Sequence, residues 1–447
     1  MKTSRKEILM TPLRIKDNSS NKKELFADIQ NLLKKIVNKT LLQLEREGVF
    51  VFPRIIGETS DLTHEQMILK EVNDTYRSGN IMGFIGYGSE RLILCSRFCI
   101  KDNDYFLQYL LDKVVDIPNI VNLDTDAHQE HRFFDLVLFL FPYYLKQAMR
   151  KGVFKKYVQN YYNNESVKGS IDIARHININ TPFIGKIAYS QREFSFDNAL
   201  TELVRHTIEY LKRKPFCQTL LNKVKDEVKL IIDATPTYEP YDKQKILDLN
   251  MKKKVRHAYF KEYLDLQKLC ILILQNQKYQ IGTGFREIYG ILFDGAWLWE
   301  EYVNTLIGDY FYHPTNKTGG GAQWLFKAPS GLTGLIYPDF IGKDKHNRII
   351  ADAKYKPMEN IGNRDYQQIL SYMFRFDANT GYYLYPESGS SDELILHLNR
   401  GSSYENVQSR DDIKVIKHGF KIPQSSANYN EFIQEMKAQE KLFAVFK

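Results

Sequence analysis

The sequence predicts a mixed α/β fold that is divided into two or three domains. Its 447 residues are too many for one ordinary hydrophobic core, and 43% of them are hydrophobic, as is usual in folded globular proteins. Glycine-punctuated, β-prone runs follow Gly48, and helical periodicities dominate the middle of the chain. We therefore expect a β-rich module at residues 1–127, a mostly helical region at 128–280 and an α/β domain at 281–447.

The composition indicates in which cellular compartment the protein acts and what kind of partner it binds. The formal net charge of +8 is compatible with a polyanionic partner such as nucleic acid. The four cysteines form no CxxC pair or disulfide framework, which favours a cytoplasmic location. The most apolar run, residues 133–145, is interrupted by Asp135 and Pro142 and is too short to span a bilayer, and no N-terminal signal sequence is present. We therefore expect no membrane role.

The N-terminal module begins with polar residues and then alternates helix with strand. Residues 1–21 are polar and charged, which predicts a loose arm. Residues 24–47 repeat leucine and isoleucine at helical spacing, so an amphipathic helix is expected there. Residues 48–100 favour a small β-rich unit with at least one hairpin, and residues 104–114 return to helical spacing.

The middle region is predicted to be mostly helical. Residues 133–162 indicate one or two helices joined near Pro142, a further helix begins near Asn198, and residues 212–274 suit two more. The basic and aromatic segment at 155–162 is compatible with nucleic-acid stacking and equally with an ordinary surface helix.

Two other kinds of site are disfavoured by spacing. Cys95 and Cys99 do not stand at zinc-site spacing from His128 and His131. No GxxxxGK[ST] sequence occurs, and the glycine run 319–321 is more compatible with a flexible turn than with a phosphate loop. The sequence thus contains no P-loop motif for nucleotide hydrolysis.

The candidate chemistry lies in a β-hairpin predicted for residues 334–355. Apolar, β-prone residues flank a polar turn at 343–347. Asp352 and Lys354 are two residues apart and share one face of their strand. The midpoint between Asp339 and Asp352 falls inside the turn, so a simple register sets the two carboxylates opposite each other.

Two carboxylates on strands would bind a hard divalent cation. Such oxygen ligands suit Mg²⁺ or Mn²⁺ better than Zn²⁺. A lysine beside the ion, here Lys354, would orient or help to deprotonate a water, which implies phosphodiester hydrolysis. The alternative is a surface hairpin in which Asp339 and Lys354 merely form an ion pair.

Helices are predicted on either side of this hairpin in the sequence. From Arg364 onward apolar residues recur at helical spacing, while Asp365, Gln368 and Tyr372 line a polar stripe. Residues 294–309 form an earlier amphipathic helix. Two acidic residues, Glu300 and Glu301, lie on this earlier helix. Further strands are expected near residues 381–386, 394 and 415, followed by a C-terminal helix from residue 430.

Three motifs resemble those of the PD-(D/E)xK nucleases of the RecB-like branch: Pro338–Asp339, Asp352–Ala353–Lys354, and Gln368 with Tyr372. The resemblance implies a restriction-endonuclease-like domain with a central mixed sheet flanked by helices. By that resemblance Asp339 and Asp352 bind the metal and Lys354 serves the attacking water. Gln368 and Tyr372 would support the site or touch DNA.

The same resemblance suggests a third acidic ligand. Trp299–Glu300 is similar to the aromatic-Glu pair on the first helix of such domains, where the acidic residue often completes the metal shell. We therefore choose Glu300 ahead of Glu301. The alternative is that both are solvent-facing helix charges.

Two segments outside the hairpin resemble a particular nuclease branch, the McrC family, which comprises the endonuclease subunits of McrBC-type restriction systems. They are KGSID at 168–172 and EFSFDN at 193–198, and residues 83–98 look like the β-rich N-terminal module of that family. The resemblance covers roughly residues 48–387. It implies a Mg²⁺-dependent DNA endonuclease that acts with, and stimulates, a separate McrB-like AAA+ GTPase that forms an oligomeric ring. A RecB-like repair exonuclease and a non-catalytic DNA-binding activator are the alternatives.

Overall fold

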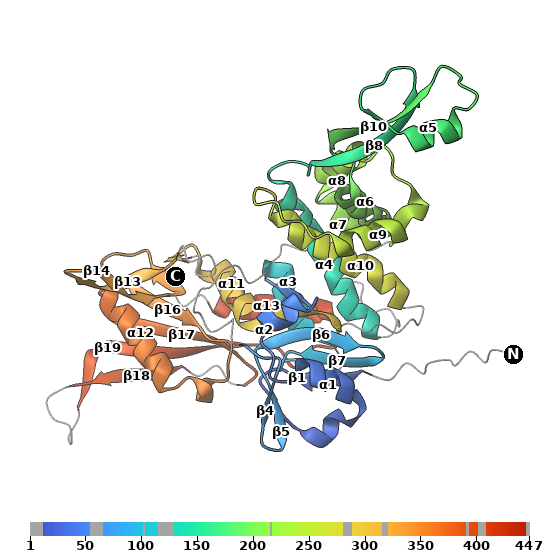
Figure 1. Cartoon of the computed structure of the whole chain (residues 1–447). Helices are drawn as coiled ribbons and strands as arrows, with labels where there is room; N and C mark the ends of the chain where they lie inside the picture. The colour runs from blue at the N-terminus through green and yellow to red at the C-terminus, as the bar shows by residue number, and fades with distance from the viewer. Residues whose placement is uncertain are drawn as a thin grey trace. The chain divides into compact units, whose positions relative to one another are not determined.

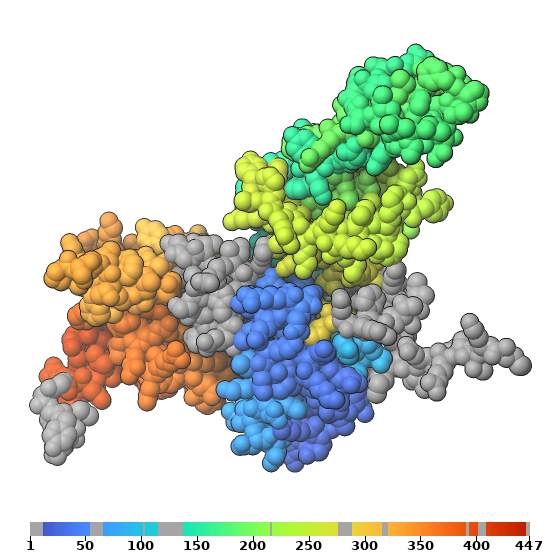
Figure 2. Space-filling model, viewed as in Figure 1, coloured from blue at the N-terminus to red at the C-terminus, as the bar shows by residue number. Residues whose placement is uncertain are grey.

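The computed structural model describes residues 12–53, 66–101, 103–114, 129–214, 217–279, 288–314, 321–389, 393–400 and 408–443. The chain forms two compact units. The first combines residues 1–133 with 284–447, and the second spans 134–283 (Figures 1 and 2). The mixture of sheets and helices confirms the predicted mixed α/β class.

The N-terminal part of the first unit is built on a five-stranded sheet. Its strands, in spatial order, are β1 (Leu13–Lys16), β7 (Glu90–Cys95), β6 (Ile81–Tyr87), β11 (Ile288–Asp294) and β3 (Phe50–Phe52). β6 and β7 form the expected antiparallel hairpin. β1 occupies part of the segment predicted to be a loose arm, and the rest of that arm before residue 12 lies outside the described residues.

Strand β11 comes from the C-terminal part of the chain but lies inside this N-terminal sheet. It pairs antiparallel with β6 and parallel with β3, and all seven of its residues are buried. The contact with β6 requires glycine, because a Cβ at Gly83 would lie 2.1 Å from the Ile291 carbonyl oxygen and one at Gly290 would lie 2.3 Å from that of Phe84. The predicted domain boundary at residue 281 differs from this arrangement, since it separates β11 from its partner strands.

A second, smaller sheet and short helices complete the N-terminal part. The sheet has the order β2 (Ser20–Lys22), β5 (Thr75–Ser78) and β4 (Leu69–Val72). The predicted helix at 24–47 is instead three pieces: η1 (Lys23–Ile29), α1 (Gln30–Ile36) and α2 (Leu41–Arg46). Asn38 has a positive φ of 57° between α1 and α2, and Thr40 begins α2 with a capping box to Gln43. Local turn and cap chemistry therefore overrides the helical periodicity.

The C-terminal part of the first unit has a six-stranded mixed sheet. Its order is β12 (Phe311–Tyr312), β15 (Phe340–Gly342), β16 (Ile349–Ala353), β17 (Thr380–Glu387), β19 (Ser409–Lys421) and β18 (Leu394–Asn399). β17 runs parallel to both β16 and β19, and the other pairs are antiparallel. Besides η1, α1 and α2, the first unit contains the helices α3 (Tyr105–Val114), α11 (Gly295–Ile307), η5 (Met358–Asn360), α12 (Asn363–Arg375) and α13 (Tyr429–Leu442).

The predicted hairpin at 334–355 is interrupted at residues 337–339, so Asp339 lies outside a regular strand. β14 (Gly331–Ile336) pairs with β13 (Gln323–Ala328) in a separate two-stranded sheet. Of the first arm of the predicted hairpin, β15 alone pairs with β16. The chain leaves regular strand geometry at residues 337–339. Pro338 lies in this break, and proline has no N–H to donate to a ladder.

The second unit contains a helical bundle and a small sheet. Its helices are α4 (Gln129–Met149), which begins just before the unit, α5 (Ile173–Ile179), α6 (Ala199–Lys212), α7 (Cys217–Asn222), α8 (Lys225–Ala234), η3 (Pro240–Asp242), α9 (Lys243–Lys252) and α10 (Glu262–Tyr279). The sheet has the order β8 (Lys156–Asn164), β10 (Ile187–Ser195) and β9 (Ser170–Ile171). None of the helices that the structure describes is long and apolar enough to cross a membrane.

Two predictions for the second unit have opposite outcomes. The helix expected near Asn198 is confirmed, because the Asn198 side chain accepts hydrogen bonds from the N–H groups of Leu200 and Thr201 and caps α6. The helix expected to extend to residue 162 is wrong, since β8 is a strand that pairs with β10 along its whole length. Tyrosine and valine side chains suit a half-buried strand, and the pairing partner lies more than twenty residues away in the sequence.

Candidate active site

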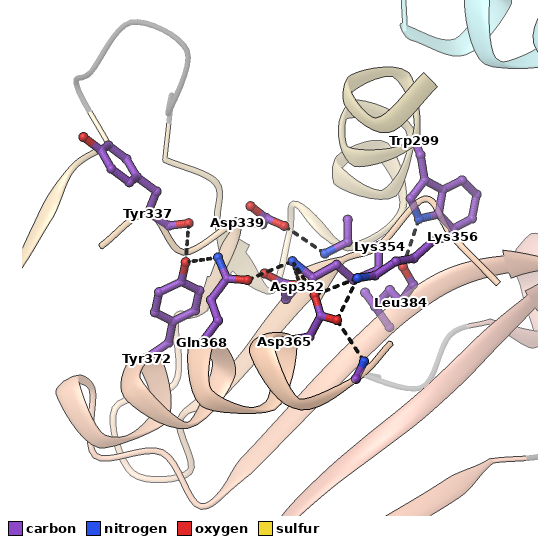
Figure 3. A network of polar contacts seen from close by, with 12 residues as sticks. Trp299, Tyr337, Asp339, Asp352, Lys354, Lys356, Asp365, Gln368, Tyr372 and Leu384 are labelled. Atoms are coloured by element: carbon purple, nitrogen blue, oxygen red, sulfur yellow. Dashed lines mark hydrogen bonds and ion pairs between the residues drawn. The ribbon is translucent and has the colours of Figure 1, made fainter. Parts of the chain in front are cut away.

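Two aspartates that the sequence singles out face each other at the end of the mixed sheet. Phe340 pairs with Ala351 across β15 and β16, so the same register extended by one residue sets Asp339 opposite Asp352. Asp352 is 1% exposed, and Asp339, in the interruption before β15, is partly exposed. The backbone N–H of Ala353 donates to Asp339 Oδ2 at 2.9 Å, which fixes this carboxylate beside the end of β16 (Figure 3).

The electrostatics of this pair favour a bound cation. Burial, followed by repulsion from Glu300 and Asp352, raises the pKa of Asp339 well above its ordinary value. Burial also raises the pKa of Asp352, although the neighbouring Lys354 opposes the rise. Two crowded carboxylates with raised pKa values would be relieved by a positive ion between them.

Lys354 places its ammonium group against both the sheet and α12. Its Nζ lies 2.7 Å from Asp352 Oδ2 and donates to Gln368 Oε1 at 3.1 Å (Figure 3). Burial lowers the pKa of Lys354, but attraction from Asp352 and Asp339 outweighs that effect and raises the pKa above its ordinary value. The side chain is therefore a cation that can orient a water or a phosphate oxygen, rather than a base.

Gln368 and Tyr372, which helical spacing predicts to share a polar stripe, are joined by a hydrogen bond. Gln368 Nε2 donates to Tyr372 Oη at 2.7 Å, and the Tyr372 hydroxyl donates to the Tyr337 carbonyl at 3.0 Å. One turn of α12 thus holds the Gln368 amide with its oxygen toward Lys354 (Figure 3). The chain of hydrogen bonds ends in the backbone just before Asp339.

Glu300 and Glu301 both lie near the site, on helix α11. Glu300 is the strongest charge that acts on the Asp339 carboxyl, and the Asp294 side chain caps the start of this helix. His313 Nε2 lies 3.8 Å from Glu300 Oε1 and 3.5 Å from Glu301 Oε1. The effect on Asp339 favours Glu300 as the acidic residue that faces the two aspartates.

Two site residues were not predicted from the sequence. His313 donates through Nδ1 to the Asp339 carbonyl at 2.9 Å and stacks on Phe340. Trp299 is fully buried and donates through Nε1 to the Leu384 carbonyl at 2.9 Å. A single histidine outside any motif gives no sequence signal, whereas Trp299 was noted only as the neighbour of Glu300.

The donor set fits a magnesium-type ion. Among the described residues no group of three or more His, Cys, Asp or Glu side chains is arranged to hold a metal. Mg²⁺ is usually bound by one or two carboxylates together with water and substrate phosphates, so Asp339 and Asp352 are the residues that would hold such an ion. The disfavoured zinc alternative gains no support, because the Cys99 thiol contacts the backbone carbonyls of Lys101 and Asn103, and His128 lies outside the described residues.

Solved structures similar to this chain include two McrBC assemblies, each with 12% sequence identity. One is the refined half-complex from a tetradecameric assembly of Thermococcus gammatolerans McrB AAA+ hexamers with bound McrC. The match covers 96% of this chain and 100% of that chain, with a TM-score of 0.48. The other is the cryo-EM structure of the Thermococcus gammatolerans McrBC complex, which covers 67% of this chain and 87% of that chain with a TM-score of 0.31.

A family model gives the decisive match. No curated protein matches the chain. Residues 76–386 match the model described as McrBC 5-methylcytosine restriction system component, and this range is more than half of the chain. The resemblance to the McrC family is confirmed, and the chain belongs to the McrBC family.

Proposed function

We propose that this protein is the metal-dependent DNA endonuclease subunit of a GTP-dependent, McrBC-type restriction system. One observation carries the proposal: Asp339 and Asp352 stand opposite each other, with the Lys354 ammonium against Asp352. The mixed sheet contains Asp352 and is flanked in the chain by Asp339 and Lys354, which supports a PD-(D/E)xK nuclease domain.

In this proposal Asp339 and Asp352 hold Mg²⁺, or Mn²⁺ in its place, and Glu300 lies near them as a further acidic residue whose charge acts on Asp339. The ion would supply positive charge to a phosphodiester and lower the pKa of a water. Lys354 keeps its proton and directs its N–H groups at the attacking water or a phosphate oxygen. Gln368 and Tyr372 hold Lys354 in that direction, so each turnover starts from the same geometry.

The proposed partner is a separate AAA+ GTPase. The sequence has no P-loop, so GTP hydrolysis would need another chain. The second unit offers a surface for it, because the segments around β8, β10 and α5 expose many large apolar side chains. These side chains are Tyr157, Tyr161, Ile171, Ile173, Ile177, Phe183, Ile184 and Phe194. We propose that this apolar surface docks onto the GTPase, and that the complex acts on DNA in the cytoplasm.

Plasmid cleavage by the reconstituted complex tests the catalytic part. The full chain is mixed with a McrB-like AAA+ GTPase, GTP and Mg²⁺. Asp352→Asn should reduce the cleavage rate by about 100-fold or more, since the metal would lose one of two carboxylates. Asp344→Asn is the matched control, because Asp344 is exposed in the turn between β15 and β16. Wild-type cleavage by Asp352→Asn would refute the proposed site.

A further inference from the structure

Four charged side chains of alternating sign form a row that begins at the proposed site. Asp352 Oδ2 lies 2.7 Å from Lys354 Nζ, which lies 3.9 Å from Asp365 Oδ1. Lys356 Nζ then donates to both oxygens of Asp365, at 2.8 and 2.7 Å (Figure 3). The row therefore links a proposed metal ligand to a lysine that the proposed chemistry does not use.

Local structure places each member of this row. Lys354 and Lys356 are two residues apart in the extended chain that continues β16, so they project in similar directions. Asp365 lies in the first turn of α12, three residues before Gln368, and these two side chains share a helix face. The backbone N–H of Gly362 donates to Asp365 Oδ2 at 3.0 Å, which fixes the carboxylate at the start of the helix.

The two carboxylates near Lys354, those of Asp352 and Asp365, lie at different distances from its ammonium group. An ammonium group has three N–H donors, and Asp352 and Gln368 lie within hydrogen-bond range of Lys354 Nζ. Asp365, at 3.9 Å, attracts Lys354 without a hydrogen bond. Lys356 holds Asp365 at that distance, because it engages both carboxylate oxygens.

We propose that Lys356 and Asp365 are positioning residues that keep the Lys354 ammonium between Asp352 and Gln368. Without Lys356, the Asp365 carboxylate is released to compete for Lys354 and draw it away from the site. Without the charge of Asp365, Lys356 loses its partner and repels Lys354. This inference rests on the proposed function, since it concerns the same reaction.

Because these side chains are largely buried, the ion pair of Lys356 and Asp365 has a larger electrostatic effect than an exposed ion pair would have. The side chains of Lys354 and Asp365 are 17% and 13% exposed, and that of Lys356 is 28% exposed. Charges in such surroundings are screened less than charges in water. The charges of Lys356 and Asp365 can therefore influence the position of Lys354, whereas an ion pair on the surface would contribute little energy.

The test measures cleavage kinetics of the full chain with its GTPase partner. Lys356→Met removes the ammonium but keeps most of the side chain, and Asp365→Asn keeps an oxygen to accept from Gly362. Each should lower kcat for DNA cleavage about tenfold with an unchanged KM for DNA, because a displaced group reduces the rate rather than substrate binding. The double variant should fall no further than either single variant, since the two residues act as one pair. Lys356→Arg should restore at least half of the rate.

Controls separate positioning from a structural role. Lys23→Met breaks another ion pair of the first unit, with Glu71, and should leave kcat unchanged. Melting temperatures of all variants identify misfolding, and Asp365→Asn answers the question if Lys356→Met does not fold. A lower melting temperature with wild-type kcat would overturn the inference, as would a raised KM with normal kcat. If Asp352→Asn is inactive while Lys356→Met is fully active, the inference fails alone; if Asp352→Asn is fully active, the proposed function fails.

Discussion

Trp299 and Lys354 donate hydrogen bonds to the same acceptor, the carbonyl oxygen of Leu384. The indole Nε1 and the Lys354 backbone nitrogen each lie 2.9 Å from that oxygen (Figure 3). Leu384 belongs to β17, so a single peptide group joins α11, β16 and β17 beside the proposed site. The helix that carries Glu300 is thereby fixed to the strand that carries Lys354.

Trp299→Phe should destabilise the protein by about 1 kcal/mol, because it removes one buried hydrogen bond while it keeps an aromatic ring. Cleavage should fall by less than in Asp352→Asn, since Lys354 keeps its own bond to Leu384. Urea unfolding and cleavage assays measure the two effects. Trp324→Phe on β13 is the control, as Trp324 is 38% exposed, and an equal loss of stability there would contradict the explanation.

Asp339→Asn should stabilise the metal-free protein at neutral pH, by about 1 kcal/mol. Burial and the charges of Glu300 and Asp352 raise the pKa of Asp339 above its ordinary value of 3.8, so the folded state resists ionisation of this group. The free-energy cost of ionising Asp339 in the folded protein is absent below pH 3.8. It grows as the pH rises and reaches its full value above the pKa that Asp339 has in the folded state. The stability gain should therefore appear only above pH 3.8. Thermal melts in EDTA from pH 3 to 8 measure it, and a gain that grows toward acid would disprove the stated cause.

Divalent ions should differ in whether they support DNA cleavage. Mg²⁺ or Mn²⁺ should restore cleavage after EDTA treatment, whereas Ca²⁺ should not, because its looser and higher coordination orients a water poorly. Mg²⁺ should also raise the melting temperature of the wild type and not that of Asp352→Asn. Cleavage in excess EDTA would exclude the metal mechanism.

Tyr372→Phe should lower the cleavage rate about tenfold, since the hydroxyl that joins Gln368 to the Tyr337 carbonyl is lost. The DNA concentration for half-maximal rate should change little if Tyr372 supports Lys354, and should rise if Tyr372 contacts DNA. Tyr366→Phe on the same helix is the matched control. Steady-state kinetics with varied DNA concentration distinguish these roles.

The sequence predicted which of these side chains lie together because their placement depends on local geometry. The register that opposes Asp339 and Asp352 depends on the turn between them, and the Gln368 and Tyr372 contact depends on helical spacing. The place of β11 was not predictable in the same way. Its partners β3 and β6 lie more than 200 residues earlier, and a buried apolar run does not identify its neighbours.

The place of β11 also changes how partner docking must be tested. A fragment of residues 1–280 would lack β11, which joins β6 to β3 in the N-terminal sheet, so its failure to bind would be uninformative. Point variants of the full chain avoid this problem. They also compare the two units directly.

Phe183→Asp in the second unit should lower stimulation of the GTPase by about tenfold or more, because a charge would replace a side chain that is 65% exposed on the proposed docking surface. Asp352→Asn should stimulate GTP hydrolysis as the wild type does, since catalysis and docking use different units. Leu25→Asp replaces a residue that is 49% exposed in the first unit and serves as the control. GTPase rates at increasing concentrations of each variant measure the effect. Loss with Leu25→Asp and not with Phe183→Asp would assign docking to the first unit instead, and loss with Asp352→Asn would show that stimulation needs the nuclease site.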